Sequence, residues 1–139
     1  MRRTLPIVAV LTALAGCQVG PEAQRTTLPP MLPDKVTPLP YSTLLERARS
    51  QLKKATEAFY IDNWGDLDEA ARGLEQTAQY MAKAEDVPAK HKDTLATAGA
   101  DLGKLAGSLR KAAADKDVKK TTDVLTKVQL KVREMRLGD

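Results

Sequence analysis

The chain has 139 residues, enough for one domain, and a formal net charge of +4. Arg2 and Arg3 carry two of its 22 basic residues, which leaves 20 basic against 18 acidic residues and excludes the dense positive charge of a nucleic-acid-binding protein. Aromatic residues make up only 4%, too few for base-stacking surfaces, and a single cysteine excludes an internal disulfide.

The first sixteen residues have the order of a secretory signal peptide. Residues 1–3 form a short positive start, residues 5–14 are mostly apolar, and small residues occupy positions 15 and 16. The apolar run is shorter than the roughly 20 residues that span a bilayer. We therefore expect residues 1–16 to be a signal peptide that is removed.

The only cysteine, Cys17, follows this segment directly. The sequence Leu14-Ala15-Gly16-Cys17 resembles the lipobox of bacterial lipoproteins, which are cut just before the cysteine. The resemblance implies a diacylglyceryl thioether on the Cys17 sulfur and an acylated amino terminus. Each buried methylene contributes about 0.8 kcal/mol, so two or three acyl chains form a durable membrane anchor. An ordinary signal peptide with an incidental cysteine is the alternative.

The residue after the cysteine bears on the destination of such a lipoprotein. Gln18 stands where Gram-negative sorting rules place Asp in proteins kept at the inner membrane. By resemblance to those rules, the chain is expected on the outer membrane, lipid-anchored in the envelope and facing the periplasm.

Residues 18–40 predict a linker. They hold six of the eight prolines in the chain, a density that excludes a regular helix or strand. A fully polyproline-like segment of this length reaches up to about 70 Å. We expect segment 17–40 to be a lipidated cysteine with a Pro-rich spacer, and a proline-rich ligand for a partner is the alternative. The prolines are Pro21, Pro29, Pro30, Pro33, Pro38 and Pro40.

Four stretches between residues 41 and 137 show apolar residues at alternating spacings of three and four, which is typical of amphipathic helices. Short turns between them predict an all-α, antiparallel up-down-up-down four-helix bundle. The apolar positions are Tyr41, Leu45, Ala48, Leu52, Ala55 and Phe59; then Trp64, Leu67, Ala71, Leu74, Ala78 and Met81; then His91, Leu95, Ala98, Leu102, Leu105, Leu109 and Ala112; and finally Val118, Thr121, Leu125, Val128, Val132 and Met135.

Polar residues and prolines indicate where these helices begin. Thr43 and Glu46 have the spacing of a capping box at the first helix, and Asp66 with Glu69 is a candidate cap for the second. Pro88 suits the first turn of the third helix, which then contains His91.

Antiparallel order brings the only histidine, His91, to the end of the bundle that also holds Met81 and Met135. Imidazole and thioether are axial ligands of b-type haem and also suit Cu(I). A haem- or copper-binding bundle is therefore the alternative to a chain without a cofactor. In the simpler interpretation, His91 is half exposed at the bundle mouth and the methionines fill the core.

The region from residue 41 onward resembles the cytochrome c′ and b-type cytochrome superfamily of periplasmic bundles. The resemblance rests on helix number and length, the turn after Phe59-Tyr60 and the Ala-rich end of the third helix at residues 111–115. Cytochromes c′ carry Cys-x-x-Cys-His near the end of the last helix, where residues 132–136 read Val-Arg-Glu-Met-Arg. In the b-type pattern the histidine lies in the fourth helix, whereas His91 lies in the third. The resemblance therefore covers architecture and not the haem motifs.

Gly99, Gly103 and Gly107 recur every four residues along the third helix. Each costs up to about 1 kcal/mol relative to alanine inside a helix, which indicates that something approaches the backbone closely. We expect this face to pack against the second helix, and a docking face for another protein or a second copy is the alternative.

Charge is uneven along the bundle. Residues 66–86 hold six acidic and two basic residues, and residues 110–136 hold nine basic and four acidic residues. Complementary faces that pair across the bundle explain this pattern, although surface pairs contribute little individually. A basic face that contacts anionic lipid or an anionic envelope polymer is the alternative.

The sequence contains no Gly-rich phosphate loop, no G-x-S-x-G elbow and no H-E-x-x-H motif. We therefore expect a non-enzymatic cell-envelope lipoprotein with a tethered helical bundle that binds or scaffolds another envelope component. The alternative is a periplasmic haem- or metal-binding bundle with its site near His91.

Overall fold

Helices form nearly all of the bundle region in the computed structural model, which describes residues 26–34 and 37–136. The described residues contain five helices and no strand, so the all-α prediction is confirmed. They are α1 (Tyr41–Tyr60), α2 (Trp64–Met81), α3 (Ala89–Lys92), α4 (Leu95–Ala114) and α5 (Val118–Glu134). The predictions of a signal peptide over 1–16 and of lipidation at Cys17 lie outside the described residues.

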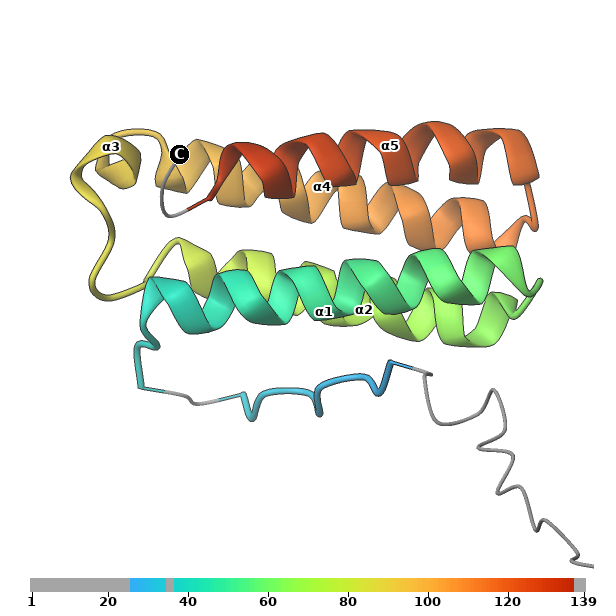
Figure 1. The fold of residues 1–139 in the computed structure, drawn as a ribbon, viewed down its shortest axis with the longest axis horizontal. Helices are drawn as coiled ribbons and strands as arrows, with labels where there is room; N and C mark the ends of the chain where they lie inside the picture. Colours follow the sequence, from blue (N-terminus) through green and yellow to red (C-terminus); the bar gives the residue numbers. More distant parts are fainter. Residues whose placement is uncertain (1–25, 35–36, 137–139) are drawn as a thin grey trace, which may run out of the picture.

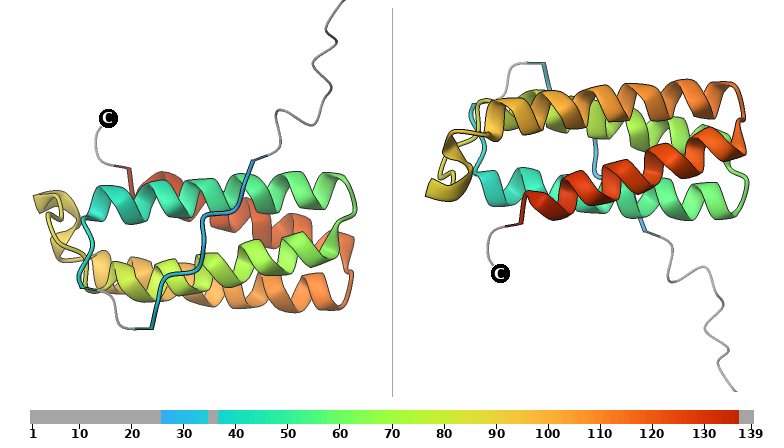
Figure 2. Two further views of the ribbon diagram at one scale, coloured as in Figure 1. Left: turned by 90° about the horizontal axis from the view of Figure 1, so that it is seen from below. Right: turned by 90° about the horizontal axis from the view of Figure 1, so that it is seen from above.

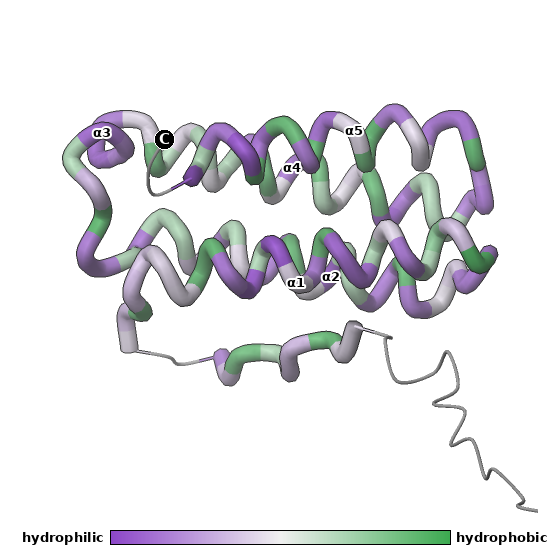
Figure 3. The backbone as a smooth tube through the Cα atoms, in the orientation of Figure 1, coloured by the Kyte–Doolittle hydropathy of each residue, from purple (hydrophilic) through white to green (hydrophobic). Residues whose placement is uncertain are grey.

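The four long helices lie side by side as a helical bundle, with the turns at residues 61–63 and 115–117 at one end and α3 at the other (Figure 1). Hydrophobic and hydrophilic stretches alternate along each of these helices (Figure 3). Because the apolar positions recur every three or four residues, each helix turns one face inward. The largest fully buried apolar side chains are Tyr41, Leu44, Leu45, Leu67, Leu74, Met81, Leu102, Leu109 and Val128.

In the fourth set of predicted apolar positions, the first one, Val118, is wrong, because this side chain is 57% exposed. Val118 is the first residue of α5, directly after the N-cap Asp117, whose side chain accepts a hydrogen bond from the Lys120 backbone N–H at 2.9 Å. Val118 therefore lies at the exposed start of the helix. The other predicted positions of this set, from Thr121 to Met135, are buried as expected.

Two predicted helix caps are also wrong. The first helix begins at Tyr41, so Thr43 and Glu46 lie inside it, and its N-cap Pro40 makes no side-chain cap bond. The Tyr41 N–H is instead satisfied by the Glu85 carbonyl at 2.8 Å. At the second helix, the side chain of Asn63 accepts from the Asp66 N–H at 3.1 Å, so Asn63 is the cap.

The connection between α2 and α4 is longer than a short turn. It spans residues 82–94 and contains the four-residue helix α3. Asp86 adopts a positive φ of 53°, and Pro88 with its fixed φ is the N-cap of α3. His91 consequently belongs to α3, whereas the third long helix begins at the buried Leu95.

Residues 26–34, here called the strap, run without helix or strand across α1 and α2 (Figure 2). The Gln76 side-chain amide holds the strap by donating to the Leu32 carbonyl at 2.7 Å and accepting from the Leu32 N–H at 2.8 Å. Arg47 donates to the Pro30 carbonyl at 2.6 Å, and the Tyr80 hydroxyl donates to the Pro33 carbonyl at 2.8 Å. The expected absence of regular structure is confirmed for this part of the linker. This part of the linker is packed on the bundle.

The third-helix glycines all face α2, and α2 with α4 is the most closely packed pair of helices. A Cβ atom on Gly99 would lie 3.1 Å from the Ala78 carbonyl oxygen, and one on Gly103 would lie 3.6 Å from the Ala78 Cβ. A Cβ on Gly107 would lie 3.4 Å from the Glu75 Oε1. The small residues therefore act within the chain by letting two helix backbones approach each other.

A fourth glycine accommodates a buried amide side chain. A Cβ atom on Gly73 of α2 would lie only 2.7 Å from the Gln51 Nε2. Gln51 is fully buried, and its Oε1 accepts a hydrogen bond from the Thr77 hydroxyl at 2.9 Å. Gly73 thus makes room for a polar link between α1 and α2 inside the core.

We call the closely packed interface of α2 and α4 the α2–α4 seam. Away from it, α1 and α5 form the least closely packed of the four neighbouring helix pairs. Figure 2 shows α5 inclined across the bundle, so that it does not follow α1 along its whole length. This pair therefore leaves a surface groove, whose lining residues are described below.

Alanine substitutions along the α2–α4 seam test the close approach. We expect Gly103→Ala to raise the free energy of unfolding by about 0.5–1 kcal/mol, because an ordinary van der Waals distance is kept and helix propensity improves. Gly99→Ala is expected to lose that gain, because its Cβ presses on a backbone oxygen that a side-chain rotation cannot move. Urea unfolding followed by circular dichroism measures both. A Gly99→Ala protein as stable as Gly103→Ala would contradict the assigned seam.

Candidate functional site

His91 is held by backbone and aromatic contacts at the α3 end of the bundle. Its Nε2 lies 2.8 Å from the Arg136 carbonyl oxygen, at hydrogen-bonding distance. Its ring centroid lies 5.7 Å from that of Tyr41, with the planes inclined by 33°. The half-buried imidazole therefore joins α3 to the residue pair that follows α5.

Tyr41 also contacts the residues that follow α5. Its hydroxyl donates a hydrogen bond to the Met135 carbonyl oxygen. Burial raises the pKa of this hydroxyl above its ordinary value, and the positive charge of Arg49 opposes that effect. The hydroxyl consequently remains a protonated donor at neutral pH.

The two methionines of the predicted haem or copper site lie in the core. Met81 is fully buried and Met135 is 2% exposed. The Cβ of Met81 faces Gly99 of α4, and Met135 is the residue whose carbonyl receives the Tyr41 hydroxyl. His91 would have to give up its bond to the Arg136 carbonyl before Nε2 bound a metal. Within residues 26–34 and 37–136, no three His, Cys, Asp or Glu side chains are grouped to hold a metal ion.

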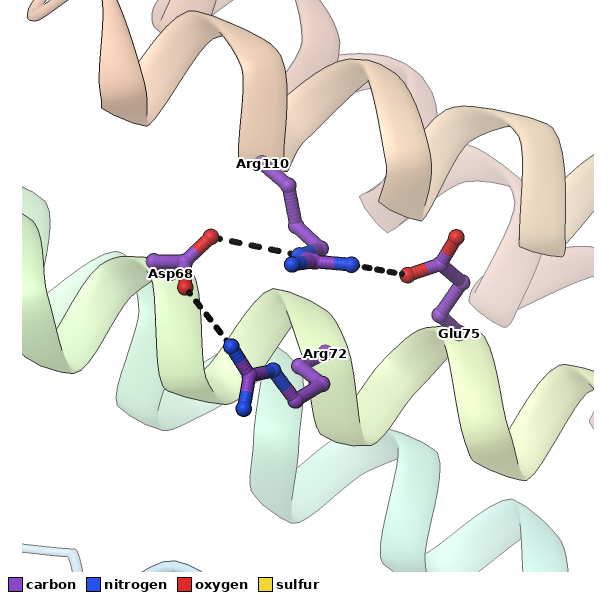
Figure 4. A network of polar contacts seen from close by, with 4 residues as sticks. All are labelled: Asp68, Arg72, Glu75 and Arg110. Atoms are coloured by element: carbon purple, nitrogen blue, oxygen red, sulfur yellow. Dashed lines mark hydrogen bonds and ion pairs between the residues drawn. The ribbon is translucent and has the colours of Figure 1, made fainter.

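Arg110 of α4 links the two acidic positions of α2 that face it (Figure 4). Its Nε lies 3.2 Å from the Asp68 Oδ1 and one terminal nitrogen lies 3.0 Å from the Glu75 Oε2. Hydrogen bonds with Glu75 and Asp68 raise the pKa of the Arg110 guanidinium. Arg72 reaches the other Asp68 oxygen at 3.7 Å. All four side chains are about one-third exposed or more, so solvent screens these pairs.

The expected pairing of the acidic segment 66–86 with the basic segment 110–136 is thus made by Arg110 and does not extend along α5. Helix α5 packs mainly on α4 and α1 rather than on the acidic helix α2. Lys131 of α5 pairs with Asp101 at 3.6 Å and Glu134 at 3.0 Å. Arg133 of α5, and Arg136 just after it, lie beside α1 instead.

A groove of about 720 Å³ runs between α1 and α5 and is open to solvent along one side. Apolar side chains lie along it, and basic side chains stand on both helices that border it. Its lining residues are Arg49, Leu52, Lys53, Thr56, Glu57 and Tyr60 of α1 with Thr126, Gln129, Leu130, Val132, Arg133 and Arg136. We call this the α1–α5 groove.

The α1–α5 groove has an excess of positive charge. Among the described residues, no carboxylate forms an ion pair with Arg49, Arg133 or Arg136, all of which are exposed. Glu57 is the only acidic residue lining the groove, and it lies 3.9 Å from the Lys53 Nζ. Sequence reasoning missed this site, although basic residues beside the apolar stripes of the first and fourth helices were the available signal.

Glu57 also receives the first described residue of the strap. The Thr26 hydroxyl donates to Glu57 Oε1 at 2.7 Å, and the Thr26 N–H donates to Oε2 at 3.1 Å. The bond from the Thr26 side chain is the largest cause of a lowered Glu57 pKa, since it stabilises the charged form. The strap therefore starts at the edge of the α1–α5 groove.

Comparison of the chain with protein-family models, with curated protein sequences and with solved structures found no match. None of the helices in the described part of the chain has both the length and the apolar character that crossing a bilayer requires.

The pairing of Gln76 with Leu32 predicts how the strap detaches. Gln76→Ala removes two hydrogen bonds, each contributing about 1 kcal/mol, so amide exchange at Leu32 should accelerate by roughly tenfold or more. Hydrogen–deuterium exchange measures this effect. Gln79→Ala, at an exposed position of the same helix, is the matched control and should leave the Leu32 exchange rate unchanged. Equal rates in both variants would show that Gln76 does not hold the strap.

The Thr26–Glu57 contact predicts a pH-dependent strap. Because the folded pKa of Glu57 is depressed, the contact is stable above the ordinary value of 4.5 and is lost as the pH falls through the depressed value. In an NMR titration from about pH 7 to about pH 3, the Thr26 amide resonance should shift with a midpoint below 4.5.

Two substitutions control this titration. Glu57→Gln should abolish the shift, whereas Glu46→Gln, at an exposed position of the same helix, should leave it intact. A titration of Thr26 that persists in Glu57→Gln would contradict the assignment.

Proposed function

We propose that the chain is a non-enzymatic lipoprotein of the bacterial cell envelope, anchored through lipid on Cys17, whose antiparallel up-down-up-down four-helix bundle binds or scaffolds another envelope component. The observation that carries the proposal is the sequence Leu14-Ala15-Gly16-Cys17 at the end of a segment with signal-peptide order. Outer-membrane attachment facing the periplasm follows from Gln18 after the cysteine.

The strap supports a bundle held near the membrane. Thr26 follows Cys17 by nine residues (26 minus 17), which span at most about 30 Å when fully extended. The proposed lipid anchor is therefore separated from the bundle by much less than the 70 Å or so that a free 18–40 linker would allow. A binding surface on the bundle would stay within a short distance of the bilayer.

The described surface supports a binding role. Some polar side chains of the core and of the α2–α4 interface pair with one another, as Gln51 with Thr77 and Arg110 with Asp68 show. The α1–α5 groove instead presents apolar side chains and unpaired positive charge to solvent. The short turns at 61–63 and 115–117, both at the end away from α3, support the up-down-up-down order (Figure 1).

The lipid anchor is tested by Cys17→Ser in a Gram-negative host grown with labelled palmitate. The unchanged protein should incorporate label, enter the detergent phase and be cut before residue 17. Cys17→Ser should lose the label and fall by at least about tenfold in the membrane fraction, since the acyl chains supply the binding energy. Gln18→Asp is the matched control, which should keep the label. A Cys17→Ser protein that stays labelled and membrane-bound would refute the anchor.

A further inference from the structure

We propose that the α1–α5 groove is a docking site for an acidic amphipathic helix of a partner protein. This proposal rests on the binding role stated above and names the chemistry of the partner. It is argued from the length of the groove, from its exposed apolar side chains and from the distribution of its charges.

The dimensions of the groove suit a helix. Its lining residues run from Arg49 to Tyr60 on α1 and from Thr126 to Arg136 on the facing side. About eleven residues at 1.5 Å each give a length near 16 Å, which is roughly three helical turns. Because the groove is open along one side, it fits an elongated partner better than a small ligand, which proteins generally enclose on most of its surface.

Apolar side chains on both sides of the groove are left uncovered by the fold. Tyr60 is 79% exposed and Leu130 is 54% exposed. Leu52, half-buried, and Val132, buried, also line the groove. A partner helix with apolar residues spaced by three and four would cover this strip in the way that α1 and α2 cover each other.

The basic residues of the groove determine which side chains should flank the apolar face of the partner helix. Arg49 and Lys53 lie one turn apart on α1; Arg133 lies in the last turn of α5, and Arg136 lies two residues after its end. The only carboxylate in the lining, that of Glu57, already accepts two bonds from Thr26. Carboxylates on both flanks of the docked helix would therefore find unpaired guanidinium groups, which bind carboxylates through two parallel hydrogen bonds.

The packing of the bundle explains how the α1–α5 groove arises. Glycines draw α4 onto α2, whereas α5 leans away from α1 over part of its length. A fifth helix in the α1–α5 groove would fill the space that this asymmetry leaves open.

The test uses the mature chain from residue 17 with Cys17→Ser, so that its outcome does not depend on lipidation. The probe is a fluorescein-labelled peptide of about 14 residues with leucines at helical spacing and glutamates on both flanks. Fluorescence anisotropy should show saturable binding. A peptide with lysine in place of every glutamate should bind at least about tenfold more weakly, since like charges then face the groove.

Two pairs of variants locate the site. Arg49→Glu with Arg133→Glu should weaken binding by at least about tenfold, and Lys111→Glu with Lys119→Glu, an equal change of charge at exposed positions outside the groove, should change it by less than about twofold. Tyr60→Ser should weaken binding by a few-fold. Its control is Ile61→Ser, because Ile61 is 60% exposed but does not line the groove.

Three outcomes overturn the proposal. They are the absence of saturable binding, an equal loss in the two charge-reversal pairs, and displacement of the peptide by phosphatidylglycerol vesicles that bind through Arg49 and Arg133. The last outcome would assign the groove to an anionic membrane surface. Each of these results leaves the lipidation experiment on Cys17 unaffected, so the two proposals fail separately.

Discussion

The close approach of α2 and α4 is the constraint on which the rest of the bundle depends. Gly99 places its backbone where a Cβ atom would meet the Ala78 carbonyl at 3.1 Å, so only glycine allows this separation without a shift of α2. Helices that meet this closely bury their small residues and exclude water from the seam. The α1–α5 side, which has no comparable seam, stays open and carries the groove.

The polar interactions follow the same division. On the tight side, Arg110 bridges Asp68 and Glu75, and Lys54 of α1 pairs with Asp66 of α2 at 2.8 Å. These contacts join helices that are already in contact, so they add specificity rather than much stability. On the open side, Arg49, Arg133 and Arg136 are exposed and form no ion pair within the described part of the chain. Charged side chains are thus paired where the helices pack closely, whereas the arginines beside the groove have no carboxylate partner among the described residues and can bind one from another molecule.

The helical fold could be predicted because the signal is local. Apolar residues spaced by three and four fix which face of each helix turns inward, and Tyr41, Leu74 and Leu102 are buried as that pattern requires. The predicted capping box at Thr43 and Glu46 failed because α1 begins two residues earlier, where the Glu85 carbonyl, distant in sequence, accepts the first N–H. Similarly, the proline density excluded regular structure in the strap but did not indicate that the strap packs on α1 and α2. The strap is fixed by Glu57, Gln76 and Tyr80, which are 31 to 47 residues away from their partners. The groove was missed for the same reason, since its existence depends on which helix pair packs tightly.

The strap also determines how the bundle would bear a pulling force. Tension applied from the amino-terminal side reaches Thr26 first, where two bonds to Glu57 resist it. The load then passes in order to the bonds at Pro30, Leu32 and Pro33 before any of it acts on the first turn of α1. Because these attachments follow one another along the chain, such tension would load them in sequence rather than all at once.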